Sequence, residues 1–328
     1  MILALITFAS WLFSNSQDSL KPFHINGFAQ GTSYNITYYA TAKEIDKGDV
    51  DALLSQIDSS LSLYKPYSRI NHFNQQRRGI KMDRHMSTVV KTAMEISAIT
   101  NSSFDITCKP LIQLWNNQVS HRQPPNFYQI KTVQKFIGTQ HLRLNNDSLL
   151  KDNPNVQIDC DGIAQGYSVD KIAQLLKQKN IRHFIVELGG EVFASGHPPG
   201  KPAWNIAIQS YGDKNFENDS IFIQLSDYAV TTSGSMSKFK KIGSKNYSHI
   251  FNPNTGQPLQ TKIISVTVLA KEAITADALD NALMVMGIDA CMNWLLQYPE
   301  VGVLIHYLDD QGIVRKTTND FFRKYLSN

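Results

Sequence analysis

The sequence predicts an α+β protein, because strand patterns outnumber helix patterns and several strands follow one another without a helix between them. Alternation of apolar and polar residues marks half-buried strands. The segments that show it are TSYNITYYA (32–40), HFIVELGG (183–190), AWNIAIQ (203–209), SIFIQLS (220–226), ISVTVLA (264–270) and VGVLIHYL (301–308). A purely parallel sheet would need a crossover between successive strands, which this spacing disfavours.

Apolar residues three or four apart predict helices. They occur in DVDALLSQIDSSLS (49–62), MSTVVKTAMEISAIT (86–100), IAQGYSVDKIAQLLKQ (163–178) and ITADALDNALMVMG (274–287). In the last segment Asp277 and Asn281 lie four residues apart, so both side chains leave one face on successive turns. Two oxygen-bearing side chains on an otherwise apolar helix indicate a ligand site.

Composition limits the function classes. The 328 residues are 42% hydrophobic and 18% charged, the balance of a folded globular protein. A formal charge of +4 is too small to indicate nucleic acid as the natural partner. The three cysteines, Cys108, Cys160 and Cys291, have no metal-type spacing and are interpreted as small buried thiols.

The first twenty residues differ from the rest. MILALITFASWLF is uncharged and is followed by the polar SNSQDS. This stretch is shorter than the roughly 20 apolar residues of a membrane span but has the length of a secretory h-region, although no Lys or Arg precedes it. We therefore expect residues 1–20 to be a signal-like or membrane-anchoring segment and residues 21–328 to form the working domain. A buried N-terminal helix is the alternative.

Residues suited to chemistry gather in the second half. VQIDCDGIAQGYSVD (156–170) is expected to run from a strand into a helix, with Gly162 at the junction and Asp159 and Asp161 beside it. Exposed amides at a helix N-terminus favour a phosphate, whereas a capped turn with solvated acids is the alternative. In VELGGEVFASG (186–196) a Gly pair follows a strand and allows close approach of a ligand, although such pairs mostly form turns.

Two later segments extend this pattern. AVTTSGSMSKF (229–239) places small hydroxyl residues and a glycine at a strand end, a composition that presents amides to an anion. His249 precedes an Asn-Pro and a Thr-Gly turn; a lone histidine is more often structural, but these neighbours favour a catalytic role. Hard oxygen ligands suit Mg²⁺, held by carboxylates and substrate phosphates. The residues alone therefore predict a Mg²⁺-dependent enzyme acting on a phosphate-bearing ligand.

Nine segments in order carry a family resemblance. They are GTSYNITY, LSLYKPYSRINHFN, SSFDITCKPLIQLW, DCDGIAQGYSVD, VELGGEVFASG, TTSGS, HIFNPNTGQPL, SVTVLA and TADALDNALMVMG. Together, roughly from Gly31 to Gly287, they resemble the FAD:protein FMN transferases of the ApbE family. The resemblance implies a single α+β domain with mixed, largely antiparallel sheets and packed helices.

The resemblance also implies a reaction. Such enzymes use Mg²⁺ to split the pyrophosphate of FAD, and they join FMN through a phosphoester to a threonine hydroxyl of an acceptor protein, releasing AMP. The usual acceptors are subunits of membrane redox complexes on the exported side. We therefore expect an exported protein, periplasmic or anchored at the outer face of the inner membrane.

Site residues follow from the matching positions. An Asp, a residue four positions later and a backbone carbonyl hold Mg²⁺ in the family; here these are Asp277, Asn281 and Gly162. His249 stands where a base would draw the proton from the acceptor threonine. The positions that match FAD-binding residues are Tyr64, Ser103, Phe104, Asp105, Asp159, Gln165 and Ile250.

Four positions depart from the family pattern. Asn281 replaces a Thr, Gln165 replaces a common Lys, Asn252 replaces the Asp of a D-P-x-T-G turn, and Asp161 stands where a small residue is usual. Two alternatives to the transferase therefore stay open. One is a Mg²⁺-dependent FAD pyrophosphatase, with water in place of the threonine hydroxyl, and the other is a flavin-binding protein without chemistry.

Overall fold

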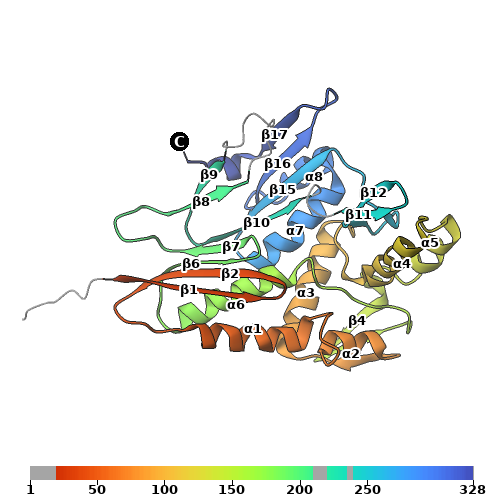
Figure 1. Ribbon diagram of the computed structural model, residues 1–328, viewed down its shortest axis with the longest axis horizontal. Coiled ribbons are helices and arrows are strands. Elements are labelled where there is room, and N and C mark those ends of the chain that lie inside the picture. Colours follow the sequence, from red (N-terminus) through yellow and green to blue (C-terminus); the bar gives the residue numbers. More distant parts are fainter. Residues whose placement is uncertain (1–19, 210–219, 235–238, 328) are drawn as a thin grey trace, which may run out of the picture.

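The structure is a computed structural model that describes residues 20–209, 220–234 and 239–327. An antiparallel sheet lies at its centre (Figure 1). The strand order is β1-β2-β6-β7-β10-β15-β16-β17, and each neighbouring pair is antiparallel. The strands are β1 (Lys21–Ala29), β2 (Thr32–Ala40), β6 (His183–Leu188), β7 (Glu191–Ser195), β10 (Tyr228–Gly234), β15 (Ile263–Ala270), β16 (Gly302–Leu308) and β17 (Val314–Thr318). The predicted α+β class with largely antiparallel sheets is confirmed.

Smaller sheets surround this one. They are β3 (Gly79–Lys81), β4 (Leu142–Asn145) and β5 (Ser148–Lys151) in one sheet, and the pairs β8 (Trp204–Ile208) with β9 (Ile221–Leu225), β11 (Phe239–Ile242) with β12 (Lys245–Ser248), and β13 (Phe251–Asn252) with β14 (Gln257–Pro258). Each of the six strands predicted from alternation is present, as β2, β6, β8, β9, β15 and β16. Alternation therefore predicted the positions of these six strands, although β15 is buried along its whole length.

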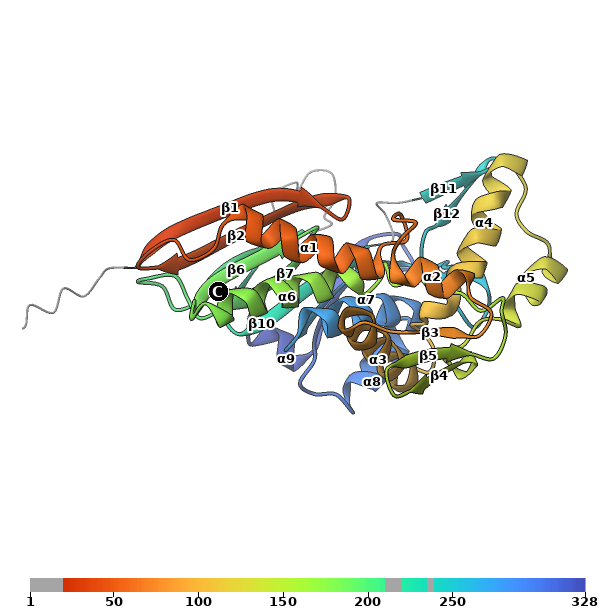
Figure 2. The ribbon, with the colours of Figure 1, turned by 90° about the horizontal axis from the view of Figure 1, so that it is seen from below.

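The helices of the described residues lie mainly on one side of the large sheet. They are α1 (Lys47–Leu61), α2 (Arg69–Gln75), α3 (Arg84–Ile99), α4 (Lys109–His121), α5 (Phe127–Gln134), α6 (Ala164–Gln178), α7 (Ala273–Met286), α8 (Ile288–Leu295) and α9 (Asp320–Arg323), with short 3₁₀ turns at Ile106–Cys108 and Thr139–His141. The four predicted helices correspond to α1, α3, α6 and α7. Figure 2 shows α1, α6 and α7 side by side along the sheet, with α4 and α5 projecting at one end.

Both faces of the sheet are covered, and the register decides which side chain enters which core. On β7, Phe193 joins the core under α6 and α7, whereas Val192 and Ala194 join a second core with Trp204 of β8. Successive strand residues point to opposite faces, so a strand covered on both sides is buried throughout. This explains why every residue of β15 is buried.

Helices α6 and α7 cross at very short range. A Cβ added at Gly166 of α6 would lie 2.3 Å from the Ala273 carbonyl oxygen and 2.7 Å from the Asp277 Cβ, so this position requires glycine. The N-cap residue of α7 makes no side-chain cap. Instead, the Asp170 carboxylate of α6 accepts hydrogen bonds from the Ala273 and Ile274 amides, at 2.8 and 2.9 Å. The two helices are thereby fixed in register, which sets the position of Asp277.

One predicted strand is wrong. Residues 156–160, expected to enter α6 as a strand, form no ladder with any strand of the described residues. Their backbone is paired with a side chain instead: Asn74 Nδ2 donates to the Ile158 carbonyl at 2.9 Å, and the Ile158 amide donates to Asn74 Oδ1 at 2.7 Å. An asparagine amide satisfies one donor and one acceptor, as a neighbouring strand would. The apolar pattern marked burial correctly but not the kind of partner.

The N-terminal segment and the cysteines were also subjects of sequence predictions. No helix in the described part of the chain is long and apolar enough to cross a membrane. Residues 1–19 of the predicted N-terminal segment lie outside the described residues. All three cysteines are buried thiols, as the sequence predicted, and burial raises the pKa of each.

Candidate active site

The predicted metal residues meet where α7 crosses the start of α6. Asp277 is only 4% exposed, and its Oδ2 accepts the Gly166 amide at 2.8 Å. Burial raises the pKa of Asp277 to about 7, and the charge of Asp170 adds to this rise. Burial disfavours the charged form of this carboxyl, and a cation bound beside it would favour the charged form again.

Asn281 joins this group from the next turn of α7. Its Nδ2 donates to the carbonyl oxygens of Asp277 and Gly162, at 3.0 and 3.4 Å, and to Asp280 Oδ1 at 3.1 Å. The structure therefore brings Gly162, Asp277 and Asn281 together, as the sequence predicted. The two ends of an asparagine amide are assigned from hydrogen bonding. Rotating this amide by half a turn would present its oxygen to a cation in place of its nitrogen.

Sequence reasoning missed Asp280. This residue is 1% exposed, and its pKa is raised well above the usual range by burial first and by Asp277 next. The hydroxyl of Ser233, near the end of β10, acts in the opposite direction and favours the charged form. The available signal was its position three residues after Asp277, which places both carboxylates on neighbouring turns of one helix. The site thus holds two buried carboxyls rather than one.

Asp159 lies on the segment that leads into α6, and Tyr64 lies on the loop between α1 and α2. The Asp159 amide donates to the Ile106 carbonyl at 2.7 Å, and Asp159 Oδ1 accepts the Asp161 amide at 2.9 Å. Tyr64 is 83% exposed. The charge of Asp161, and to a smaller extent that of Asp159, raises the pKa of the Tyr64 phenol. An exposed aromatic ring beside backbone amides is suited to a flat ligand.

The segment Ser103–Asp105 follows a tight turn in which Asn101 and Ser102 have positive φ angles of 49° and 58°. Asp105 caps the 3₁₀ turn after it, accepting from the Thr107 amide at 2.8 Å and the Thr107 hydroxyl at 2.6 Å. Phe104 is buried, and a Cβ added at Gly162 would lie 3.4 Å from its ring. Phe104 therefore lies beside the metal residues, whereas Asp105 shapes the loop.

Gln165, in the first turn of α6, has its side chain against the glycine turn between β6 and β7. A Cβ at Gly189 would be 2.9 Å from Gln165 Nε2, and both Gly189 and Gly190 have positive φ angles, of 66° and 109°. Any side chain at Gly189 would be strained and would displace the Gln165 amide. The Gly pair of the VELGG segment therefore forms a turn, as such pairs mostly do. This turn also borders the candidate site.

His249 and Ile250 open the β13–β14 turn. His249 is half-buried, and the Ile250 amide donates to Ser248 Oγ at 3.1 Å. The turn is anchored on α4 and α5, where Trp115 Nε1 donates to the Gly256 carbonyl at 3.1 Å. Asn252 Oδ1 accepts the Asn254 and Thr255 amides at 2.9 and 3.2 Å. Asn252 therefore shapes this turn through an acceptor oxygen, the group that an Asp would also supply.

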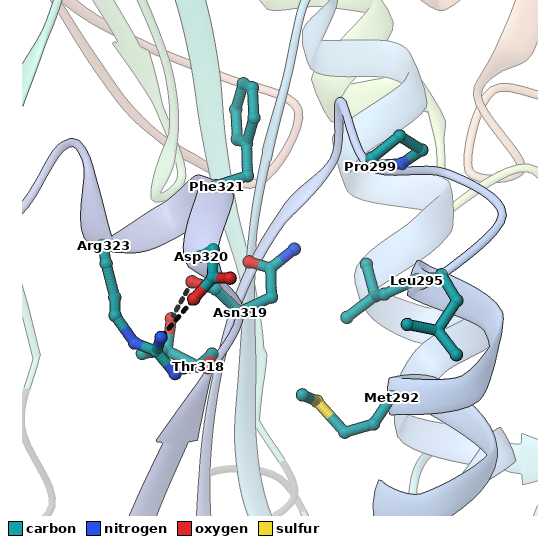
Figure 3. Close-up of a pocket in the computed structure, with 9 residues that line it drawn as sticks. Met292, Leu295, Pro299, Thr318, Asn319, Asp320, Phe321 and Arg323 are labelled. Atoms are coloured by element: carbon teal, nitrogen blue, oxygen red, sulfur yellow. Dashed lines mark hydrogen bonds and ion pairs between the residues drawn. The ribbon is translucent and has the colours of Figure 1, made fainter.

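A separate pocket of about 410 Å³ lies between α8 and the start of α9, as Figure 3 shows. It is lined by Met292, Leu295, Leu296, Pro299, Thr318, Asn319, Asp320, Phe321 and Arg323. None of the predicted site residues contributes to it. The pocket is therefore distinct from the candidate active site.

The fold is that of flavin transferases with known structures. The chain matches the structure of flavin transferase ApbE from Vibrio cholerae with a TM-score of 0.83 and 29% identity, over 94% of this chain and 100% of that one. It matches flavinyl transferase ApbE from Pseudomonas stutzeri with a TM-score of 0.84 and 28% identity, over 94% and 97%.

The sequence relationship extends over almost the whole chain. The model of the ApbE family matches residues 30–305, and the chain belongs to this family. It is 31% identical over 325 residues to the FAD:protein FMN transferase of Vibrio cholerae, covering 96% of both chains. It is 32% identical over 249 residues to the Escherichia coli K12 protein of the same name, covering 74% of this chain and 71% of that one.

Proposed function

We propose that this chain is an FAD:protein FMN transferase that attaches FMN to a threonine hydroxyl of an acceptor protein and releases AMP. Membership of the ApbE family, and relatives named FAD:protein FMN transferase that match over 96% and 71% of their lengths, support the transferase over the pyrophosphatase and the non-catalytic flavin carrier. The observation that carries the proposal is the meeting of Gly162, Asp277 and Asn281 at the α6–α7 crossing.

The residues at this crossing fit Mg²⁺. The donor set is a buried carboxylate, a backbone carbonyl and an amide, all hard ligands, and the second buried carboxyl, that of Asp280, lies beside them. Within the described residues no three His, Cys, Asp or Glu side chains are grouped to hold a metal alone. Mg²⁺ keeps several waters and substrate phosphates as ligands, so it does not need such a group.

The chain's own residues divide the remaining work. FAD would lie between Tyr64 on one side and Asp159, Gln165 and the Ser103–Phe104 loop on the other, with its pyrophosphate toward Asp277. Bound Mg²⁺ would neutralise the pyrophosphate and stabilise the leaving AMP.

The bond that forms joins the threonine Oγ to the FMN phosphorus, and the bond that breaks is the pyrophosphate P–O bond to AMP. His249 would take the proton that the threonine hydroxyl loses.

Partner and location follow the same proposal. The acceptor would be a threonine-bearing subunit of a membrane redox complex, presented in the periplasm or at the outer face of the inner membrane. The uncharged stretch within residues 1–20 supports export or anchoring, with residues 21–328 as one transferase domain.

The test uses the full chain in detergent with FAD, MgCl₂ and a threonine-bearing acceptor domain. Intact-mass spectrometry should show an acceptor heavier by one FMN, AMP should appear in equal amount, and EDTA should abolish both. An acceptor with Thr→Ala is the matched control. AMP without a mass shift on any acceptor would favour the pyrophosphatase, and bound FAD without either product would favour the carrier.

The base assignment has its own test. His249→Gln should lower transfer about 10²- to 10⁴-fold, the usual contribution of a general base, while FAD affinity stays within about threefold. His24, an exposed-strand histidine that hydrogen-bonds Thr37, provides the control variant His24→Gln. Full transfer activity in His249→Gln would remove His249 from the mechanism.

A further inference from the structure

The short helix α2 bonds to two segments of the candidate flavin site, the Tyr64 loop and the segment before α6. It is fixed in the core by Ile70 and Phe73, both fully buried, and it is capped by the Ser68 hydroxyl, which accepts the Asn71 amide at 3.3 Å. Asn71 and Asn74 lie three residues apart on this helix, on adjacent turns. Both side chains bond to backbone outside α2 rather than to other side chains.

Asn71 holds the loop that carries Tyr64. Its Nδ2 donates to the carbonyl oxygens of Ser62, Leu63 and Lys65, at 3.3, 3.0 and 2.9 Å. These carbonyls surround Tyr64 in sequence, in a loop without helix or strand. The path of the loop is therefore set from α2.

Asn74 holds the opposite segment. It is 7% exposed and pairs with both backbone groups of Ile158, directly before Asp159 and four residues before Gly162. The preceding turn is held in the same way by buried Lys151, whose Nζ donates to the Val156 carbonyl at 2.7 Å. Side chains thus do for this segment what a neighbouring strand does elsewhere.

We propose that Asn71 and Asn74 are positioning residues for the flavin site, which set the separation of the Tyr64 loop from the Asp159–Gly162 segment. The inference deepens the proposed function and rests on it. Asn71 and Asn74 bond to these two segments from one short helix, so α2 links the Tyr64 loop to the Asp159–Gly162 segment. Holding both in place from one helix reduces the ordering cost that FAD would otherwise meet on binding.

The two asparagines have different expected effects. The Asn71 loop contains no proposed metal ligand, whereas the Asn74 segment leads to the Gly162 carbonyl. Asn71→Ala should therefore raise the Kd for FAD about tenfold and leave the Kd for Mg²⁺ unchanged. Asn74→Ala should raise both about tenfold. A role in folding alone would not separate the two ligands in this way.

The matched control is Asn319, which clamps backbone in the same manner beside the remote pocket (Figure 3). Its Nδ2 donates to the Val301 carbonyl at 2.7 Å, and its Oδ1 accepts the Val303 amide at 3.0 Å. Asn319→Ala should lower the melting temperature as much as the α2 variants do but leave both Kd values unchanged. Calorimetric titration of the full chain with FAD and, separately, with MgCl₂ gives these values.

If both α2 variants bind FAD as tightly as wild type does, the inference is overturned. The proposed function still stands in that case, provided that the wild-type chain transfers FMN. A wild-type chain that binds no FAD would overturn both. If Asn74→Ala does not fold, Asn74→Ser keeps a small hydroxyl that satisfies one Ile158 group, and the same paired loss of FAD and Mg²⁺ affinity is expected. Equal Mg²⁺ affinity in Asn74→Ser and wild type would also contradict the role of Asn74.

Discussion

The two halves of the candidate site are built in different ways. The metal half, Gly162, Asp277 and Asn281, lies where two long helices cross, and it is fixed by Gly166 packing and by the Asp170 cap. The flavin half consists of Tyr64, Ser103, Phe104, Asp105, Asp159, Gln165 and Ile250, most of which lie on loops. These loops are held by side-chain hydrogen bonds from elements distant in sequence, such as Asn74.

This difference predicts different responses to substitution. A helix crossing is held by close packing, so a small change in one residue is felt by the whole contact. A loop held by single hydrogen bonds loses about 0.5–1.5 kcal/mol for each bond removed. The metal half should therefore fail abruptly, whereas the flavin half should weaken in steps.

The largest expected effect is at Asp277. Asp277→Asn removes the buried charge of the metal half, and transfer should fall at least about 10³-fold because a metal supplies several kcal/mol of transition-state stabilisation. Calorimetry should show no Mg²⁺ binding, while FAD alone should bind within about threefold of wild type. Asp289→Asn, on the exposed start of α8, is the control. A fully active Asp277→Asn would remove the metal assignment.

The next effect concerns pH. Burial raises the pKa of Asp170 to about 7, above the unfolded value of 3.8. The folded state then binds the extra proton between these values, so the stability that this group contributes is complete below pH 4 and is lost as the pH rises through 7. The loss amounts to at most about 4 kcal/mol.

Asp170→Asn cannot ionise and should remove this part of the pH slope. Urea unfolding of wild type and Asp170→Asn at pH 5 and pH 8 in EDTA measures it, with Asp289→Asn expected to follow wild type. Parallel slopes in Asp170→Asn and wild type would show that Asp170 does not titrate in this range. Such a result would weaken the account of the α6–α7 contact as a buried cap.

The Asp277–Asn281 pair follows from a local pattern in the sequence, whereas the contacts that hold the flavin half are not local. Spacing of four residues places Asp277 and Asn281 on one helix face, which is a local property. The clamp of Asn74 on Ile158 joins residues 84 positions apart, and no local pattern reports it. Asp280 lies in the same helix, three residues after Asp277, so a local pattern could have predicted it. It was missed because only the four-residue spacing of Asp277 and Asn281 was considered.

A smaller effect tests the close approach of α6 and α7. Gly166→Ala would place a methyl group 2.3 Å from the Ala273 carbonyl oxygen, so the helices must separate. Overpacking of this kind costs about 1–3 kcal/mol. Gly48→Ala, where the added carbon meets only the Asp46 carboxylate oxygen at 3.1 Å and no backbone atom, should change stability by less than about 1 kcal/mol. Equal unfolding midpoints for the two variants would contradict the packing argument.

The smallest effect is expected at Asn281, because the metal half already contains a carboxylate and a carbonyl. Asn281→Thr exchanges an amide oxygen for a hydroxyl oxygen on the same turn, and both are neutral hard ligands. The kcat for transfer and the Kd for Mg²⁺ should each change by less than about tenfold. Asp280→Asn, beside it in space, is the contrast, since it removes an ionisable carboxyl instead of exchanging neutral ligands.

A gain in turnover well above tenfold in Asn281→Thr would change this account. The Nδ2 contact with the Gly162 carbonyl would then be the resting arrangement of the amide, in which a donor occupies the direction that a cation needs. In that case the sequence would supply all residues of the metal half, but the Asn281 amide would keep the cation out. The flavin carrier would then gain support over the transferase. A change within tenfold means instead that the amide turns its oxygen to the cation, and that the helix crossing tolerates either ligand.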